Sequence, residues 1–146
     1  DTDLKKLYQG RILALAADIP LTDRLETPQA TVKKRSPLCG STVTVDVSVD
    51  GDVITEFGQD VKACALGQAA ASVLGAVAIG RSLSEIETAR DELKAMLSKG
   101  GPAPAPPFQD FEALQPAQDF RNRHASIMLA IEATAEAMAK AQAKAA

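Results

Sequence analysis

Valines alternate with polar residues from position 43 to 49, and this pattern constrains the fold more than any other feature of the chain. The valines are Val43, Val45, Val47 and Val49, and the polar residues between them are Thr44, Asp46 and Ser48. Because side chains alternate between the two faces of a β-strand, the valines should face a core and the polar groups should face water. Asp50-Gly51 is a strong two-residue hairpin turn. A returning strand should then run from Val53 to near Gln59.

A third strand is predicted before the hairpin. Residues 30–35 have the pattern of an edge strand, and Lys33-Lys34-Arg35 supplies charge that discourages edge-to-edge pairing. The basic run is most simply a solvated strand, with a docking patch for a partner as the alternative. The sequence therefore predicts a small antiparallel sheet with one wet face and with helices over the other.

Helical patterns lie on both sides of this sheet in the chain. Residues 4–17 place apolar side chains at helical spacing, which gives one face that needs a partner. Residues 65–79 are small or apolar on almost every side, as in a helix at the middle of a domain. Ser82 and Glu85 form a capping box, which opens a charged surface helix that should end at Gly100-Gly101.

The last third of the chain begins with a proline-rich connector over residues 100–107. Phe108, Phe111 and Leu114 should pin a short turn or helix back on the body. A final helix should include residues 121–138 and bring His124 to its start. Its Ala- and Lys-rich end, residues 139–146, has little to bury and is expected to fray.

Size and charge limit the class of protein. The 146 residues suggest one domain over 1–146, and the net charge of −3 argues against a nucleic-acid partner held through phosphate neutralisation. No apolar run is long enough to cross a membrane. With no secretory signature, the two cysteines are expected to stay reduced, so we expect a cytoplasmic protein. Neither a phosphate-binding loop nor a triad of catalytic residues is evident, and we expect no enzymatic activity. The oligomeric state is left open.

The chain carries two cysteines and one histidine, and all three lie at the ends of predicted elements. Cys39 sits between a rigid Pro-Leu and a permissive Gly40, and Cys64 opens the small-residue helix. A thiolate at a helix N-terminus is favoured by free N–H groups and by the macrodipole. Arg121 and Arg123 precede His124 and raise the positive potential near an anionic sulfur. Such thiolates suit metal ligation or sulfur transfer.

The alternative is that these three residues have only structural roles and neither bind a metal nor transfer sulfur. A free cysteine is often a small buried hydrophobe, and a lone histidine at a helix start is often a capping or surface residue. The spacings match no zinc-finger signature, so Cys39, Cys64 and His124 could ligate zinc or iron only if the fold gathers them.

Pro37-Leu38-Cys39-Gly40, the valine hairpin and Cys64 at a helix start together resemble the NifU/IscU-type iron–sulfur cluster scaffold proteins, including their SufU branch. The resemblance covers essentially the whole chain. The sequence from Arg123 to Ile127 resembles the family's third ligand element, in which a His-Cys or Arg-x-Cys sequence is followed by a small apolar helix. The implied fold is α+β, a three-stranded antiparallel sheet packed against a layer of helices, with the cysteines clustered at one end.

The resemblance also implies a function. Such proteins receive sulfur from a cysteine desulfurase, assemble a [2Fe–2S] cluster or bind Zn²⁺, and pass the product to acceptor proteins. Carried over by motif, Cys39 and Cys64 are the first two thiolate ligands and His124 is the third. Gly40, Ser41 and Arg123 would lie near the site.

Two departures from the family pattern motivate a second hypothesis. Ser41 stands where the pattern has Asp after Cys-Gly, and Ala125 stands where it has the third Cys. An adaptor that kept the fold and binds assembly partners without metal is therefore the alternative function. A third possibility is a redox pair of Cys39 and Cys64, which requires α-carbons within about 7 Å of one another.

Overall fold

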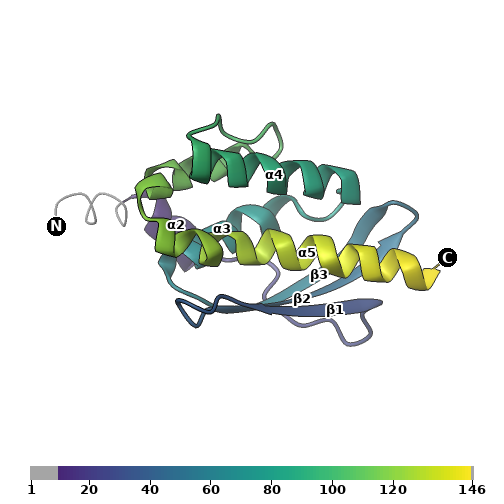
Figure 1. The fold of residues 1–146 in the computed structure, drawn as a ribbon. Coiled ribbons are helices and arrows are strands. Elements are labelled where there is room, and N and C mark those ends of the chain that lie inside the picture. The colour runs from purple at the N-terminus through teal and green to yellow at the C-terminus, as the bar shows by residue number, and fades with distance from the viewer. Residues whose placement is uncertain (1–9, 146) are drawn as a thin grey trace.

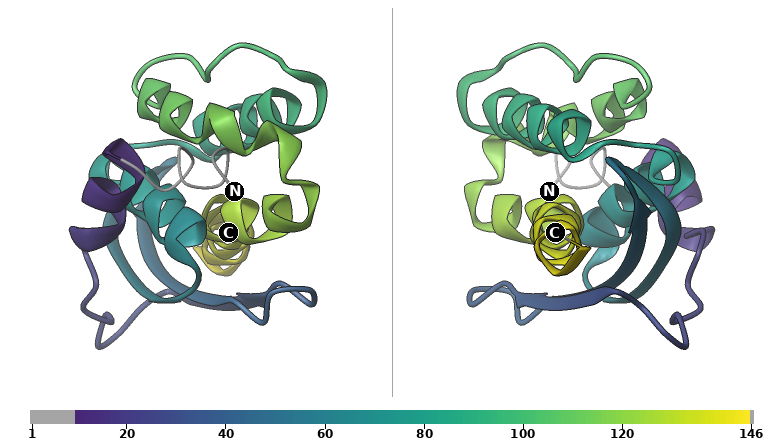
Figure 2. Two further views of the ribbon diagram at one scale, coloured as in Figure 1. Left: turned by 90° about the vertical axis from the view of Figure 1, so that its left-hand side faces the viewer. Right: turned by 90° about the vertical axis from the view of Figure 1, so that its right-hand side faces the viewer.

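The computed structural model describes residues 10–145, which form three layers: the sheet, then α3 and α5, then α4 with the 3₁₀ segments (Figures 1 and 2). In chain order the elements are α2 (Arg11–Ala17), β1 (Ala30–Arg35), β2 (Thr42–Asp50), β3 (Val53–Lys62), α3 (Ala65–Val77), α4 (Leu83–Lys99), the 3₁₀ helices η1 (Gln109–Asp119) and η2 (Arg121–Arg123), and α5 (His124–Ala145). The predicted α+β class with a three-stranded antiparallel sheet is confirmed.

The sheet has the order β1-β2-β3, with both pairs antiparallel. Val43, Val45 and Val47 have no exposed surface and lie on the face that α3 and α5 cover. The predicted edge strand, residues 30–35, is confirmed as β1. The returning strand is longer than predicted and continues beyond Gln59 to Lys62, because its last residues pair with the start of β2.

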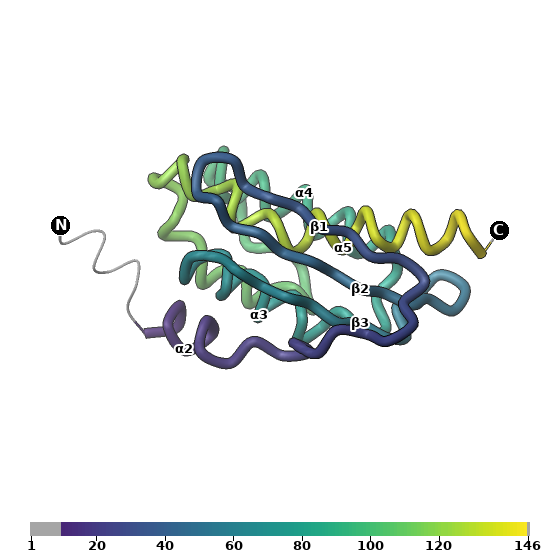
Figure 3. Tube along the Cα trace, turned by 90° about the horizontal axis from the view of Figure 1, so that it is seen from below, coloured from purple at the N-terminus to yellow at the C-terminus, as the bar shows by residue number. Residues whose placement is uncertain are grey.

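The prediction that the polar face of β2 meets water is wrong. Asp46 has no exposed surface, and Thr44 and Ser48 are 9% and 8% exposed. The segment between α2 and β1 runs along β3 before it turns into β1 (Figure 3). Within this segment, Arg24 and the backbone N–H of Leu25 donate hydrogen bonds to the Asp46 carboxylate. The Asp46 side chain therefore holds this chain segment against the sheet.

The small-residue helix α3 lies inside the molecule as predicted, with nine of its residues buried. It packs against α2, α5 and β3. A Cβ on Gly75 would lie 2.7 Å from Gln59 Nε2 and 3.0 Å from Pro20 Cγ. The glycine therefore allows the segment after α2 to approach the helix closely.

The charged helix α4 has the predicted boundaries. The Ser82 side chain accepts from the N–H of Glu85, and the Glu85 side chain accepts from the N–H of Ser82, which completes the capping box. Gly100 follows the last turn in the left-handed conformation, with φ 68°. After the connector, Phe111 and Leu114 are fully buried in η1, so this short helix is pinned to the body as expected.

The final helix differs from the prediction at both ends. Arg121 and Arg123 belong to η2 and not to α5, because the Arg123 N–H donates to Phe120 O in the i→i+3 pattern of a 3₁₀ turn. The C-terminal part buries more than expected: α5 continues to Ala145, and Ala141 is fully buried.

Part of the predicted N-terminal helix lies outside the described residues. Of positions 4–17, the structure describes 10–17, and α2 occupies Arg11–Ala17. Within the described residues, none of the helices has the length and apolar character needed to cross a membrane.

Candidate metal and sulfur site

Cys39 lies in the loop that joins β1 to β2. The Ser36 N–H donates to Ser41 O, and the Gly40 N–H donates to Ser36 O, both at 2.8 Å. Gly40 has φ 68°, a conformation that favours glycine, and it lets the chain reverse directly after Cys39. The loop leaves Cys39 exposed, next to Leu38, which is 78% exposed. The local sequence therefore presents this thiol on a tight turn.

Cys64 is the N-cap of α3, where β3 ends and the helix begins. Its side chain is only partly exposed. Burial raises the pKa of the Cys64 thiol, but hydrogen bonds from Ser126 and from the first backbone N–H groups of α3, with the positive charge of Arg123, outweigh this effect. The pKa of Cys64 is therefore lower than usual, which favours the thiolate that ligates metals.

Contacts to η2 and to the first turn of α5 bring the two cysteines to the same end of the molecule. The Cys39 thiol donates to Asn122 O at 3.3 Å, and Cys64 Sγ lies 3.5 Å from Ser126 Oγ. Ser126 Oγ in turn donates to Ser41 Oγ at 3.0 Å. Both cysteines are free thiols. Segments far apart in the chain thus converge around two sulfur atoms.

His124 is the first residue of α5, but its ring is engaged elsewhere. Its Nε2 lies 2.9 Å from Ala117 O and 3.1 Å from Gln118 O, at the end of η1. Because carbonyl oxygens only accept, Nε2 must carry the proton, which leaves Nδ1 as the free lone pair of the neutral ring. His124 and Ser126 lie about 200° apart around the helix. The His124 ring therefore lies on a different side of α5 from Ser126 and from the Cys64 sulfur that Ser126 contacts.

The predicted ligand set is consequently not assembled in this conformation. Among the residues that the structure describes, no group of three or more His, Cys, Asp or Glu side chains is placed to hold a metal ion. His124 and Ala125 instead line a hollow of about 270 Å³ between α4 and α5. The structure brings Cys39 and Cys64 to one end of the sheet without the imidazole.

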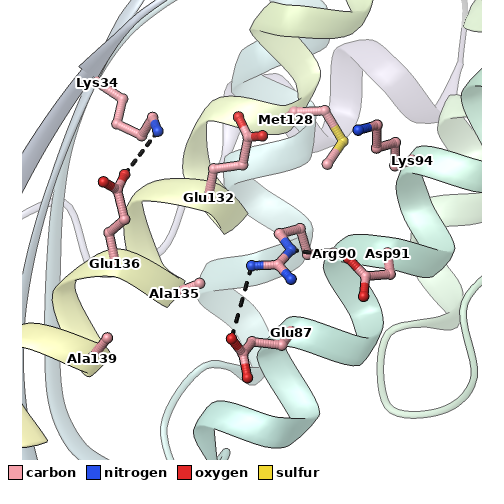
Figure 4. Close-up of a pocket in the computed structure, with 10 residues that line it drawn as sticks. All are labelled: Lys34, Glu87, Arg90, Asp91, Lys94, Met128, Glu132, Ala135, Glu136 and Ala139. Atoms are coloured by element: carbon pink, nitrogen blue, oxygen red, sulfur yellow. Dashed lines mark hydrogen bonds and ion pairs between the residues drawn. The ribbon is translucent and has the colours of Figure 1, made fainter.

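A larger, charged groove of about 430 Å³ lies further along α4 and α5 and is bordered by β1 (Figure 4). Lys34 and Glu136 form an ion pair of 2.8 Å on one side, and Arg90 pairs with Asp91 at 3.1 Å on the other. None of the predicted site residues lines this groove. It therefore does not belong to the thiol site.

Sequence reasoning missed Asn122 and Ser126, which hold the two thiols. Asn122 acts through its carbonyl oxygen, which every residue carries, so no sequence pattern marks it. Ser126 lies within the motif from Arg123 to Ile127, but the motif gives its hydroxyl no role. The contact to Cys64 exists because α3 and α5 pack closely, and that packing joins residues 62 positions apart.

The fold places the chain in a known class of proteins. A nitrogen-fixing NifU-like protein (N-terminal) from Brucella abortus has a structure that superposes with a TM-score of 0.93 at 39% identity, over 97% of this chain and 99% of that one. A protein from Fervidobacterium islandicum, described as an iron–sulfur cluster assembly scaffold for the SUF system, has the same fold with a TM-score of 0.79 at 19% identity. That match covers 91% of this chain and 97% of the other.

The family follows from the sequence as well. The model of the NifU-like N terminal domain matches residues 8–145. The chain belongs to this family, and its resemblance to the NifU/IscU-type proteins is confirmed. No curated protein matches the sequence.

Proposed function

We propose that this protein is an iron–sulfur cluster assembly scaffold, or a zinc-bound relative that relays sulfur. The observation that carries the proposal is the convergence of Cys39 and Cys64 at one end of a NifU-like fold, through their contacts to Asn122 and Ser126. One thiol is exposed and the other has a lowered pKa. Such a pair suits soft metal ions and sulfide.

In this proposal the cluster or ion is cargo that the protein builds and releases. Cys39 and Cys64 supply thiolates, and His124 supplies the third ligand once its ring leaves the carbonyl oxygens of η1 and turns toward the two sulfur atoms. Two thiolates and one imidazole leave one coordination position open, which suits zinc or an asymmetrically held [2Fe–2S] cluster. Gly40 shapes the Cys39 turn, and Arg123 contributes positive charge near Cys64.

The partners follow from this role. A cysteine desulfurase would deliver sulfur, and acceptor proteins would remove the finished product. The exposed position of Cys39 on its turn supports direct contact with both. The protein would bind and present its cargo without catalysing a reaction, as one domain over residues 1–146. The reducing cytoplasm is the compartment in which both thiols would stay available.

Replacing Cys39 or Cys64 by serine tests the proposal. Wild type and both variants are reconstituted anaerobically with iron and sulfide, or with zinc, and then analysed for metal content and absorption. We expect the wild type to hold stoichiometric metal and each variant to lose most of it. Ser84→Ala, an exposed hydroxyl on α4, is the control and should bind as the wild type does. Full retention by C39S or C64S would overturn the proposal.

The second candidate is an adaptor that binds assembly partners without metal. The specific observation in its favour is that the His124 ring is bound to η1, so that among residues 10–145 no third His, Cys, Asp or Glu side chain joins the two thiols. Metal analysis of untagged protein, purified without chelator, separates the two candidates. The scaffold should contain zinc or iron in stoichiometric amount, and the adaptor should contain neither.

A further inference from the structure

We propose that Ser126 and Ser41 form a hydroxyl pair that positions the Cys64 sulfur, with Ser126 touching the sulfur and Ser41 acting through Ser126. This inference rests on the proposed function, because it assigns the support of one proposed ligand. It gives Ser41 a role that its sequence position does not reveal. Both residues are positioning residues and neither is a ligand.

The contacts form a continuous chain. Cys64 Sγ lies 3.5 Å from Ser126 Oγ, and Ser126 Oγ lies 3.0 Å from Ser41 Oγ. A hydroxyl has one proton and two lone pairs, so the chain can run in either direction. In the structure Ser126 Oγ donates to Ser41 Oγ, so the Cys64 thiol is the donor to Ser126. Once the sulfur is bound to metal and has lost its proton, both hydroxyls would reverse, with Ser41 donating to Ser126 and Ser126 donating to the sulfur.

Burial makes the pair dependent on its own hydrogen bonds. Ser126 is 1% exposed and Ser41 is 4% exposed, so water cannot readily replace a lost partner. The Ser41 hydroxyl is hydrogen-bonded to Ser126 and does not point into solvent beside Cys39. Removal of either hydroxyl should therefore change how firmly the Cys64 sulfur is held in position.

The backbone is arranged to let this contact form. A Cβ on Gly67, in the first turn of α3, would lie 2.7 Å from Ser126 Oγ and 3.2 Å from Ser126 O. Glycine at a helix interior is unfavourable by roughly 0.5–1 kcal/mol relative to alanine, so it is expected where close approach is needed. This glycine brings the N-terminal turn of α3 against the first turn of α5.

The test uses the full chain and Zn²⁺ as the probe. Zinc affinity is measured by chelator competition at fixed pH for wild type, S126A, S41A and the double variant, and Co²⁺ absorption reports thiolate ligation. Ser72→Ala is the matched control, because Ser72 is also buried and donates to a backbone carbonyl, that of Asp18, away from the cysteines. Thermal unfolding checks that every variant is folded.

We expect S126A to weaken zinc binding about tenfold or more, in the range that loss of a supporting hydrogen bond produces at metal sites. S41A should weaken it less, and the double variant should be no weaker than S126A, because Ser41 acts through Ser126. S72A should bind as the wild type does. The inference is overturned if S126A binds as tightly as S72A, or if the two single effects multiply. If S126A does not fold, S41A is compared with S72A. A lower zinc affinity in S41A supports the inference, and equal affinities overturn it.

Failure of the proposed function has a different result. If the wild type holds no zinc, or if C64S holds it equally well, Cys64 is not a ligand. The hydroxyl pair is then tested on the metal-free chain by crystal structures of wild type, S126A and S72A. We expect the Cys64 sulfur to keep its position in S72A and to move to another rotamer in S126A, because the contact to Ser126 Oγ holds it in place. An unchanged sulfur position in S126A would overturn the inference on this arm.

Discussion

Arg24 holds the carboxylate of Asp46 through two hydrogen bonds, of 2.6 Å from Nε and 3.1 Å from Nη2. The carboxylate also accepts from Thr31 Oγ1 at 2.6 Å and from the N–H of Leu25 at 3.1 Å. Asp46 is fully buried, whereas the Arg24 side chain is half exposed. One carboxylate on β2 thus ties the segment after α2 to β1 and to the sheet.

Asp46→Asn should destabilise the protein strongly. The amide keeps the shape of the carboxylate but loses its charge, so Arg24 loses its charged partner. Each carboxylate oxygen accepts from two of the four donors, so an NH₂ group in place of either oxygen meets two of them. We expect the free energy of unfolding to fall by about 1–3 kcal/mol, the cost of leaving buried donors without an acceptor. Denaturant unfolding measures the change.

Glu56→Gln is the control for that experiment. Glu56 is an exposed carboxylate on β3, opposite Ser48 and on the same face of the sheet as Asp46. It should change the free energy of unfolding by no more than about 0.5 kcal/mol, as surface substitutions usually do. Equal effects of the two substitutions would show that the buried contacts of Asp46 contribute nothing.

The same carboxylate should make stability depend on pH. Burial raises the pKa of Asp46, but the hydrogen bonds from Arg24, Thr31 and the Leu25 N–H outweigh it, so the pKa is below its usual value. The unfolded pKa is about 3.9, so this stabilisation is complete above that pH and is lost as pH falls through the lower folded pKa. Unfolding from neutral pH down to about pH 3 should show a steep loss in the wild type and a shallower one in D46N. Parallel curves would contradict the assignment.

The contrast between the two faces of β2 shows how far sequence reasoning reaches. Burial of Val45 and Val47 follows from strand periodicity alone, because a side chain's face is set by its position in the strand. Burial of Asp46 does not, since it depends on Arg24, which lies 22 residues earlier in a segment without regular structure. Local patterns predict elements, and only the fold shows which irregular segment covers them.

The thiol site also combines local features that the sequence predicts with tertiary contacts that it does not. The turn at Cys39 and the helix start at Cys64 are local features, and the sequence predicts both. The contacts that bring them together involve the Asn122 carbonyl and the Ser126 hydroxyl, and these depend on how α3 packs on α5. The engagement of His124 with η1 is also tertiary, so motif spacing could not reveal it.

Gly67→Ala should destabilise the protein although alanine is the better helix former. The added Cβ would lie 2.7 Å from Ser126 Oγ and 2.8 Å from Ala63 Cβ, so α3 and α5 must separate. We expect a loss of about 1–3 kcal/mol in the free energy of unfolding, as for other overpacked sites. Ala76→Gly at an exposed position of α3 isolates helix propensity and should cost about 1 kcal/mol. Stabilisation by G67A would show that the two helices are not in close contact there.

His124→Ala separates the two possible roles of the imidazole. His124 Nε2 holds the end of η1 through the carbonyl oxygens of Ala117 and Gln118, so the variant should unfold at a lower temperature in either case. If His124 is also the third ligand, zinc affinity should fall by at least about tenfold. Chelator competition and a thermal unfolding curve on the same samples measure both effects.

Ser72→Ala provides the comparison for this last experiment, because it too removes a side-chain donor to a backbone carbonyl but lies outside the thiol site. It should lower the unfolding temperature and leave zinc binding unchanged. If His124 is a ligand, H124A and S72A should both unfold at a lower temperature, but only H124A should bind zinc more weakly. That difference in zinc affinity measures the contribution of the imidazole as a ligand. If H124A lowers the unfolding temperature and binds zinc as S72A does, the imidazole only supports η1, and Cys39 and Cys64 must find their further ligands elsewhere, such as on a partner protein.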